Sequence, residues 1–212
     1  MRDQVLEAID HAVLCSVPML AIMSNAEPAI GYALCTDNDL GGIYVAGYTA
    51  SDASMFREDN YRYRPAEWPM EYLIQEASHL LNEWVYLQSL NDADSLEPGD
   101  DHLRPWKADV FEDIVSILEK NRAAGTFNDD MTVLFISHDP SPWMADKIND
   151  AIRRLNSSEV YDEWKREIYD GWIEAQLQWQ EFQAKRPKNI IKRYFGNFWS
   201  SIRRMYSNRT LP

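Results

Sequence analysis

Hydrophobic residues recur every three or four positions in five segments of the chain, the spacing of an amphipathic helix with one apolar face. The expected helices cover residues 3–24, 70–90, 105–124, 143–155 and 158–185. In the first, Pro18 removes a backbone donor, so we expect it to kink or end the first part of that helix. The third is expected to close near Gly125.

Three other stretches have the composition of β-strands. Residues 29–36 and 43–48 are separated by the turn-forming run Asp37 to Gly42, which predicts a β-hairpin. Residues 131–137 are apolar and β-branched throughout, as in a strand buried on both faces, and this strand is expected beside the hairpin. The predicted fold is α+β, with a small central sheet (hairpin 29–48 plus strand 131–137) flanked by several helices, including a long C-terminal one.

Two shorter segments connect the hairpin to the second helix. Residues 49–59 suit a short helix with Thr49 or Ser51 as its N-cap. Residues 61–69 contain two prolines among aromatic and basic side chains, which predicts an ordered loop.

Charge divides the chain into an acidic body and a basic end. Residues 1–185 hold all 34 acidic and 14 of the 21 basic residues, a net charge of -20, whereas residues 186–212 hold seven basic residues and no acid. We therefore expect a single acidic α+β domain over 1–185 and a basic, aromatic helical extension over 186–212.

An acidic body repels phosphate backbones, so no nucleic-acid binding through residues 1–185 is expected, whereas a basic protein partner would be attracted to it. Residues 190–206 have the pattern of a basic amphipathic helix, which could contact a membrane, bind a partner or dock onto its own acidic body. Neither a signal peptide nor a membrane span is predicted, so the expected location is cytoplasmic. Cys15 and Cys35 are expected to be small buried hydrophobic residues, not a disulfide or a metal site.

Three motifs carry a resemblance to a known group of proteins. The first is Tyr-Ala-Leu-x-Thr-Asp at 32–37, the second is Tyr-x-x-x-Pro-x-Glu-Trp at 61–68, and the third is the apolar segment 133–139, which ends in Asp. In this order they resemble a bacterial domain family of unknown function, over roughly residues 1–155. Some of its members are similar to the immunity proteins that protect bacteria from secreted toxins. The resemblance implies a catalytically silent protein that binds a toxin.

The candidate partner-binding residues lie in two loops. In the first, Arg62 and Arg64 alternate with Tyr61 and Tyr63, a pattern able to bind an anionic group through arginine while stacking on rings. The second is an acidic loop after the helix 70–90. The predicted contacts are Tyr61, Arg62, Tyr63, Arg64, Glu67, Trp68, Asp92, Asp94, Glu97, Asp100 and Asp101. The alternative for the first loop is structural: Trp68 and the tyrosines fill the core while Glu67 pairs with an arginine.

No catalytic, metal or cofactor site is predicted, although one enzymatic alternative stays open. Ser137, His138 and Asp139 are consecutive and alternate in direction at a strand end, so they cannot form a hydrolase triad. His138 and Asp139, with another histidine, could instead serve a metal-assisted hydrolase. Asp37, Asn38 and Asp39 lack the spacing of a calcium loop and are expected to be a solvated turn.

Overall fold

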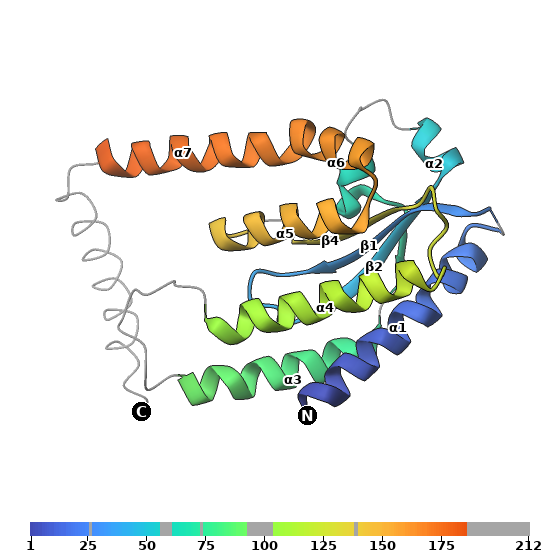
Figure 1. Ribbon diagram of the computed structural model, residues 1–212, viewed down its shortest axis with the longest axis horizontal. Coiled ribbons are helices and arrows are strands. Elements are labelled where there is room, and N and C mark those ends of the chain that lie inside the picture. The colour runs from blue at the N-terminus through green and yellow to red at the C-terminus, as the bar shows by residue number, and fades with distance from the viewer. Residues whose placement is uncertain (26, 56–60, 73, 93–103, 138–139, 186–212) are drawn as a thin grey trace, which may run out of the picture. The chain divides into compact units, whose positions relative to one another are not determined.

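The computed structural model describes residues 1–25, 27–55, 61–72, 74–92, 104–137 and 140–185 (Figure 1). The chain divides into two compact units, Met1–Gly171 and Trp172–Pro212. The first unit contains the whole sheet and all the packing described below. Of the second unit, the structure describes the part of helix α7 (Asp170–Lys185) that lies beyond Gly171.

The core of the first unit is a four-stranded sheet with the order β3-β2-β1-β4, which confirms the α+β class. Strands β1 (Ala29–Thr36) and β2 (Ile43–Thr49) form the predicted antiparallel hairpin. Strand β4 (Thr132–Ser137) pairs in parallel with β1, and Tyr32 lies opposite Val133. The third predicted strand therefore lies beside the hairpin, and all six of its residues are buried.

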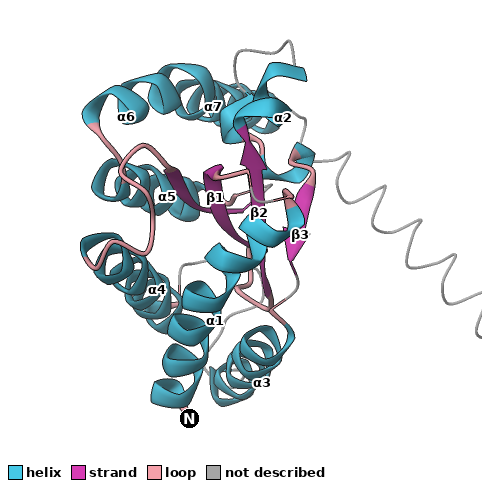
Figure 2. Cartoon of the chain, turned by 90° about the vertical axis from the view of Figure 1, so that its right-hand side faces the viewer, coloured by secondary structure: helices cyan, strands magenta, loops and turns pink. Residues whose placement is uncertain are grey.

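Three helices cover one face of the sheet: α1 (Arg2–Met23), α3 (Gln75–Asp92) and α4 (Pro105–Ala123), below the sheet in Figures 1 and 2. Ser16 of α1 lies 3.1 Å from the Tyr32 hydroxyl, and Phe111 of α4 packs on Phe135 with ring centroids 4.6 Å apart. At Gly47 a Cβ atom would lie 2.7 Å from Leu20, so a glycine is needed for α1 to approach β2 this closely.

The opposite face is covered by the segment after α2 (Ala50–Met55), which forms two 3-10 helices, η1 (Tyr61–Tyr63) and η2 (Pro65–Glu67), and by α6 (Ser158–Trp164). Tyr48 packs on Trp68, with ring centroids 4.6 Å apart, and Tyr63 packs edge-on against Trp164 at 5.7 Å. Aromatic side chains thus join the segment 61–68 to both the sheet and α6.

The outer edge of β4 is covered by α5 (Pro142–Leu155). Asn156, directly after α5, accepts a hydrogen bond from Val133 N at 2.8 Å and donates one to Val133 O at 2.7 Å. Its side-chain amide thereby satisfies backbone groups that a further strand would otherwise pair with. Asn156 and α5 thus both cover the outer edge of β4.

Four predictions about local structure need correction or refinement. Met70–Tyr72 form strand β3, antiparallel to β2, because this short stretch pairs with the hairpin before the helix begins at Gln75. Pro18 neither breaks nor ends α1, which continues to Met23. Cys35 is buried as expected, but Cys15 is exposed, because it lies on a side of α1 that faces away from the sheet. The segment 158–185 is divided by a π-helix, η4 (Lys165–Tyr169), between α6 and α7.

The short helix α2 begins as predicted. Thr49 Oγ1 accepts a hydrogen bond from Asp52 N at 3.2 Å, and Asp52 Oδ2 accepts one from Thr49 N at 2.8 Å. This reciprocal arrangement is a capping box, so Thr49 is the N-cap.

Helix α1 is long and apolar enough to cross a membrane by length and composition alone, with a mean hydropathy of 1.7 over its most apolar window. Only 28% of that window is buried in this fold. The fully buried residues are Val5, Ile9, Val13, Ser16 and Leu20. They form one stripe along the helix, so the remaining apolar surface of α1 faces away from the protein core.

Candidate functional site

The segment 61–68 was the first candidate for partner binding, and the structure places two of its aromatic side chains, Tyr63 and Trp68, in the core. Tyr63 is 2% exposed and Trp68 is 5% exposed. Tyr63 and Trp68 therefore follow the structural alternative, in which aromatic residues of this loop fill the core. Tyr61 belongs to η1, and its side chain is not among those described.

Arg62 and Tyr63 are held by one carboxylate on α6. Arg62 Nη1 donates to Glu163 Oε2 at 2.8 Å, and the Tyr63 hydroxyl donates to the same oxygen at 3.0 Å. The Tyr63 hydroxyl also lies 3.1 Å from Val160 O. Burial, with a further contribution from Glu163, raises the pKa of Tyr63, so the hydroxyl remains a donor at neutral pH. This arrangement fixes the segment to α6.

The remaining candidates differ in accessibility. Arg64 forms an ion pair with Glu67 at 3.3 Å, and both side chains are about as exposed as Arg62, so the outward edge of this segment is charged. Of the acidic loop, Asp92 ends helix α3 and its side chain is not described. Asp94, Glu97, Asp100 and Asp101 lie outside the described residues.

The enzymatic alternative cannot be placed, since His138 and Asp139 also lie outside the described residues. Within the described ranges, no three His, Cys, Asp or Glu side chains lie close enough together to hold a metal ion. Asp37 is engaged in the hairpin turn, where its Oδ1 accepts hydrogen bonds from Asp39 N at 2.9 Å and Gly41 N at 2.8 Å. This is the turn geometry expected from the sequence.

The structure adds a surface that the sequence did not indicate: a groove between α1 and α3. These two helices lie next to each other in Figure 2. The groove consists of two adjoining hollows with volumes of about 490 and 350 Å³. Three residues, Ala8, His11 and Glu76, line both of them. We call this surface the α1–α3 groove. Its lining combines residues of α1, of α3 and of the segment just before α3: Gln4, Glu7, Ala8, His11, Ala12, Cys15, Tyr72, Ile74, Gln75, Glu76, Ala77 and Leu80.

The less exposed residues of the groove are small or apolar, and its exposed residues are mostly polar and include two glutamates. Ala77 is buried and Ala8, Ala12 and Leu80 are half-buried, while Glu7 and Glu76 are exposed. In the part of the chain that the structure describes, neither Glu7 nor Glu76 forms an ion pair. Helix α3 contains no Lys or Arg, and α1 contains only Arg2, which pairs with Asp113 of α4 at 2.5 Å.

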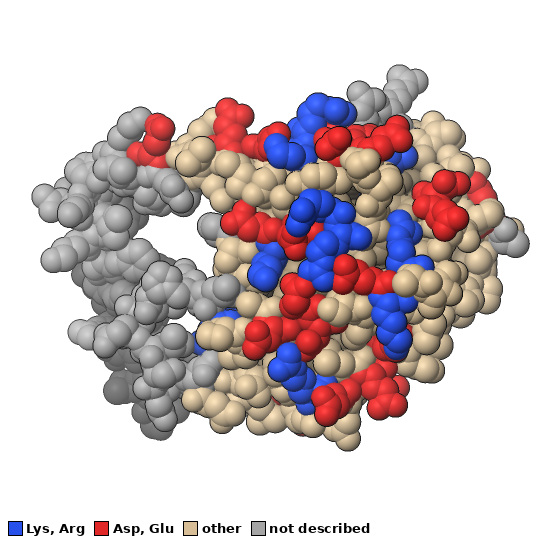
Figure 3. Space-filling model, in the orientation of Figure 1, with Lys and Arg blue, Asp and Glu red and all other residues tan. Residues whose placement is uncertain are grey.

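The surface of α4 and α5 has a different charge pattern. Positive and negative side chains alternate across it in Figure 3. Arg154 forms ion pairs with three carboxylates: Glu112, Glu119 at 2.5 Å and Asp150 at 3.6 Å. Lys147 lies 3.6 Å from Glu112 as well. This face largely neutralises its own charge, whereas the rim of the α1–α3 groove retains a negative charge.

Comparisons with protein-family models, with curated proteins and with solved structures found no match. The α1–α3 groove could not be recognised from the sequence, because its two walls are separated by more than sixty positions and none of its side chains is chemically unusual. The one available signal was the high apolar content of residues 3–24, which exceeds what a single buried stripe requires.

Proposed function

We propose that this chain is a non-catalytic protein-binding protein, an immunity-type protein that neutralises a bacterial toxin by covering its active surface. The observation that supports it most is the outward apolar surface of α1. Ile22 is 68% exposed and Leu14 is 48% exposed, and both belong to a helix whose other face already packs on the sheet.

Further exposed apolar side chains lie on α3, where Tyr86, Leu87 and Leu90 point away from the core. Single exposed apolar residues are ordinary on protein surfaces, whereas several on one helix, as on α1 and again on α3, are candidates for protein contact. Tyrosines such as Tyr86 are enriched among the residues that contribute most of the binding free energy in protein interfaces.

The charge of the protein suits a basic partner. A net charge of -20 on residues 1–185 would accelerate association with a positively charged protein and make it sensitive to salt. A protein that covers the active surface of a toxin needs no reacting group of its own, only a surface of matching shape and charge.

The proposal is tested by affinity capture of the tagged full-length protein from its native cells at low and moderate salt, followed by expression of whatever co-purifies. We expect a stoichiometric, salt-sensitive protein that is toxic when expressed alone and harmless when co-expressed with this chain. A double variant, Leu14→Ser with Ile22→Ser, should weaken the capture, and Glu159→Gln on α6 serves as a surface control.

A clean monomer that turns over a substrate in a metal-dependent manner would contradict the proposal. In that case His138→Ala should abolish the turnover, and the metal-assisted hydrolase that uses His138 and Asp139 would take its place. A captured protein that is equally toxic with and without this chain would also contradict the immunity function.

A further inference from the structure

The shape of the α1–α3 groove limits what can occupy it. The groove lies between two packed helices, and its floor carries Ala8 and Ala12 one turn apart on α1 together with Ala77 on α3. Small side chains at a helix surface allow another backbone to approach closely. Leu80 of α3 and Tyr72 of β3 add apolar contact area. Such a floor suits the apolar face of an amphipathic helix.

The charge of the groove limits the occupant further. Glu7 and Glu76 stand on opposite walls, and neither has an ion-pair partner among the described residues. Glu83, also exposed, continues the negative charge along α3, which has no basic residue of its own. Negative rims on both sides repel an acidic segment and favour one whose polar face carries Lys or Arg.

We infer that the α1–α3 groove binds a basic amphipathic helix belonging to the protein partner, with its apolar face on Ala8, Ala12 and Leu80 and its basic residues beside Glu7 and Glu76. This inference rests on the proposed function and names the chemistry of the partner segment. The α4–α5 face offers no comparable site, because Arg154 and its carboxylate neighbours already pair with one another.

The test uses the purified full-length protein and a fluorescein-labelled Leu/Lys peptide of about 18 residues, long enough to form a helix on binding. Fluorescence anisotropy should show saturable binding that weakens as salt rises. The double variant Glu7→Gln with Glu76→Gln should weaken binding roughly tenfold, the effect expected of two charge pairs at an interface rim. Ala8→Leu, which fills the floor, should weaken binding with the acidic rim intact.

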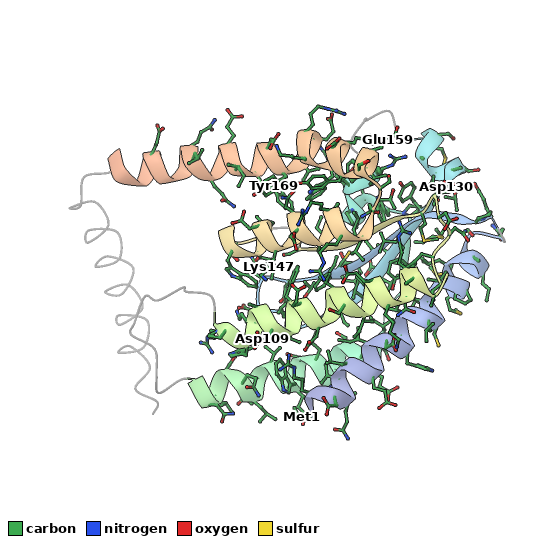
Figure 4. The ribbon with its side chains drawn as sticks, viewed as in Figure 1. Met1, Asp109, Asp130, Lys147, Glu159 and Tyr169 are labelled. Carbon is green, nitrogen blue, oxygen red and sulfur yellow. The ribbon has the colours of Figure 1, made fainter. Side chains whose placement is uncertain are left out.

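Two controls separate this site from general attraction between opposite charges. Glu159→Gln with Asp162→Asn removes two exposed carboxylates from α6, on the other face of the sheet, where Glu159 is labelled in Figure 4. It should change the affinity by less than about twofold, since distant exposed charges are largely screened. A peptide of identical composition whose scrambled order has no apolar face should bind at least several times more weakly.

Equal loss of binding in the α6 control, or equal binding of the scrambled peptide, would overturn the inference. The outcome also separates the two proposals. If a toxin is captured and neutralised but its binding is unchanged by Glu7→Gln with Glu76→Gln and by Ala8→Leu, the groove is excluded and the immunity function stands. If the peptide binds as expected and no toxin is captured, the groove remains a binding site and the immunity function fails.

Discussion

Helix α1 and strand β4 are both strongly apolar segments, yet the fold treats them differently. All six residues of β4 are buried, whereas five of the 22 residues of α1 are fully buried. The sequence predicted the burial of β4, because a continuous apolar run of strand length has both faces to cover. For residues 3–24 it predicted an amphipathic helix with one apolar face, which left the apolar residues outside that face without an assigned role.

The neighbours of each element explain the difference. Strand β4 lies between β1 and α5, and helices and loops cover both of its faces. Helix α1 belongs to the outer layer, where it contacts α3, α4 and the sheet along one side only. Comparing the two shows that apolar composition specifies burial only when the topology supplies a partner for every face.

Cysteine labelling should show the contrast most strongly. Burial raises the pKa of Cys35 to about 12 and shields its sulfur, whereas Cys15 on α1 is exposed. We expect a thiol-reactive probe to modify Cys15 readily and Cys35 more than about a thousandfold more slowly, through rare unfolding events. Mass spectrometry of timed samples, with Cys15→Ser as the control, measures both rates. Comparable rates for the two thiols would contradict the burial of β1.

Truncation of a β4 side chain should produce the largest change in the free energy of unfolding. Phe135 is fully buried against Phe111, so Phe135→Ala removes a ring and leaves a cavity that should cost about 3–5 kcal/mol. Urea denaturation followed by tryptophan fluorescence measures the loss. Phe135→Leu, which keeps most of the volume, should cost less than about 1.5 kcal/mol. Equal losses for the two variants would exclude tight packing at this position.

A smaller and pH-dependent change is expected where α1 is fixed to α4. Burial opposes ionisation of Asp10, but hydrogen bonds from Lys120 and Asn121 outweigh it and lower the pKa of Asp10 below its ordinary 3.8. The stabilisation is therefore fully present above about pH 4 and is lost as the pH falls through the lowered value. Asp10→Asn should cost at most about 1 kcal/mol at pH 7, because the pair is partly exposed.

Urea denaturation at pH 7 and at pH values below 3 measures this difference, which should vanish in acid. The matched control is Asp130→Asn, which changes an exposed residue that is labelled in Figure 4. Its effect on the free energy of unfolding should be the same at both pH values. A cost for Asp10→Asn that grows in acid would contradict the assigned direction of the pKa shift.

The smallest effect on stability is expected on the outward surface of α1. Ile22→Ser should change the free energy of unfolding by less than about 0.5 kcal/mol, because the side chain is exposed. Two positions earlier, Leu20 is fully buried, and Leu20→Ala should cost about 2–5 kcal/mol. Thermal or urea denaturation of both variants compares them directly. Similar losses would mean that α1 is covered on both sides.

Much of the fold could be predicted from local patterns. The hairpin, the buried strand after Met131 and the start of α4 at Pro105 follow from alternation, β-branching and a proline in the first helical turn. Strand β3 could not be predicted in this way, because three residues are too few to show a period and their pairing with β2 is a tertiary interaction. Pro18 did not mark a helix end, since α1 continues past it to Met23.

The site was harder to predict than the fold. Alternating arginine and tyrosine in 61–68 was compatible with recognition and with core packing, and the partners of Tyr63 and Trp68 distinguish the two. The position of Tyr63 depends on its contacts with α6, whose residues lie about a hundred positions further along the chain. The α1–α3 groove likewise depends on how two distant helices meet, and sequence periodicity alone carries no such information.

Asn156 gives the connection between α5 and α6 a fixed length. Its amide is bound to Val133 on the sheet, and the next residue, Ser157, is the N-cap of α6 through the bond from Val160 N. One added residue at this junction would release either the strand edge or the helix that carries Glu163 and Trp164. Evolutionary insertions and deletions should therefore be tolerated poorly at this junction, however variable the exposed turns of the chain become.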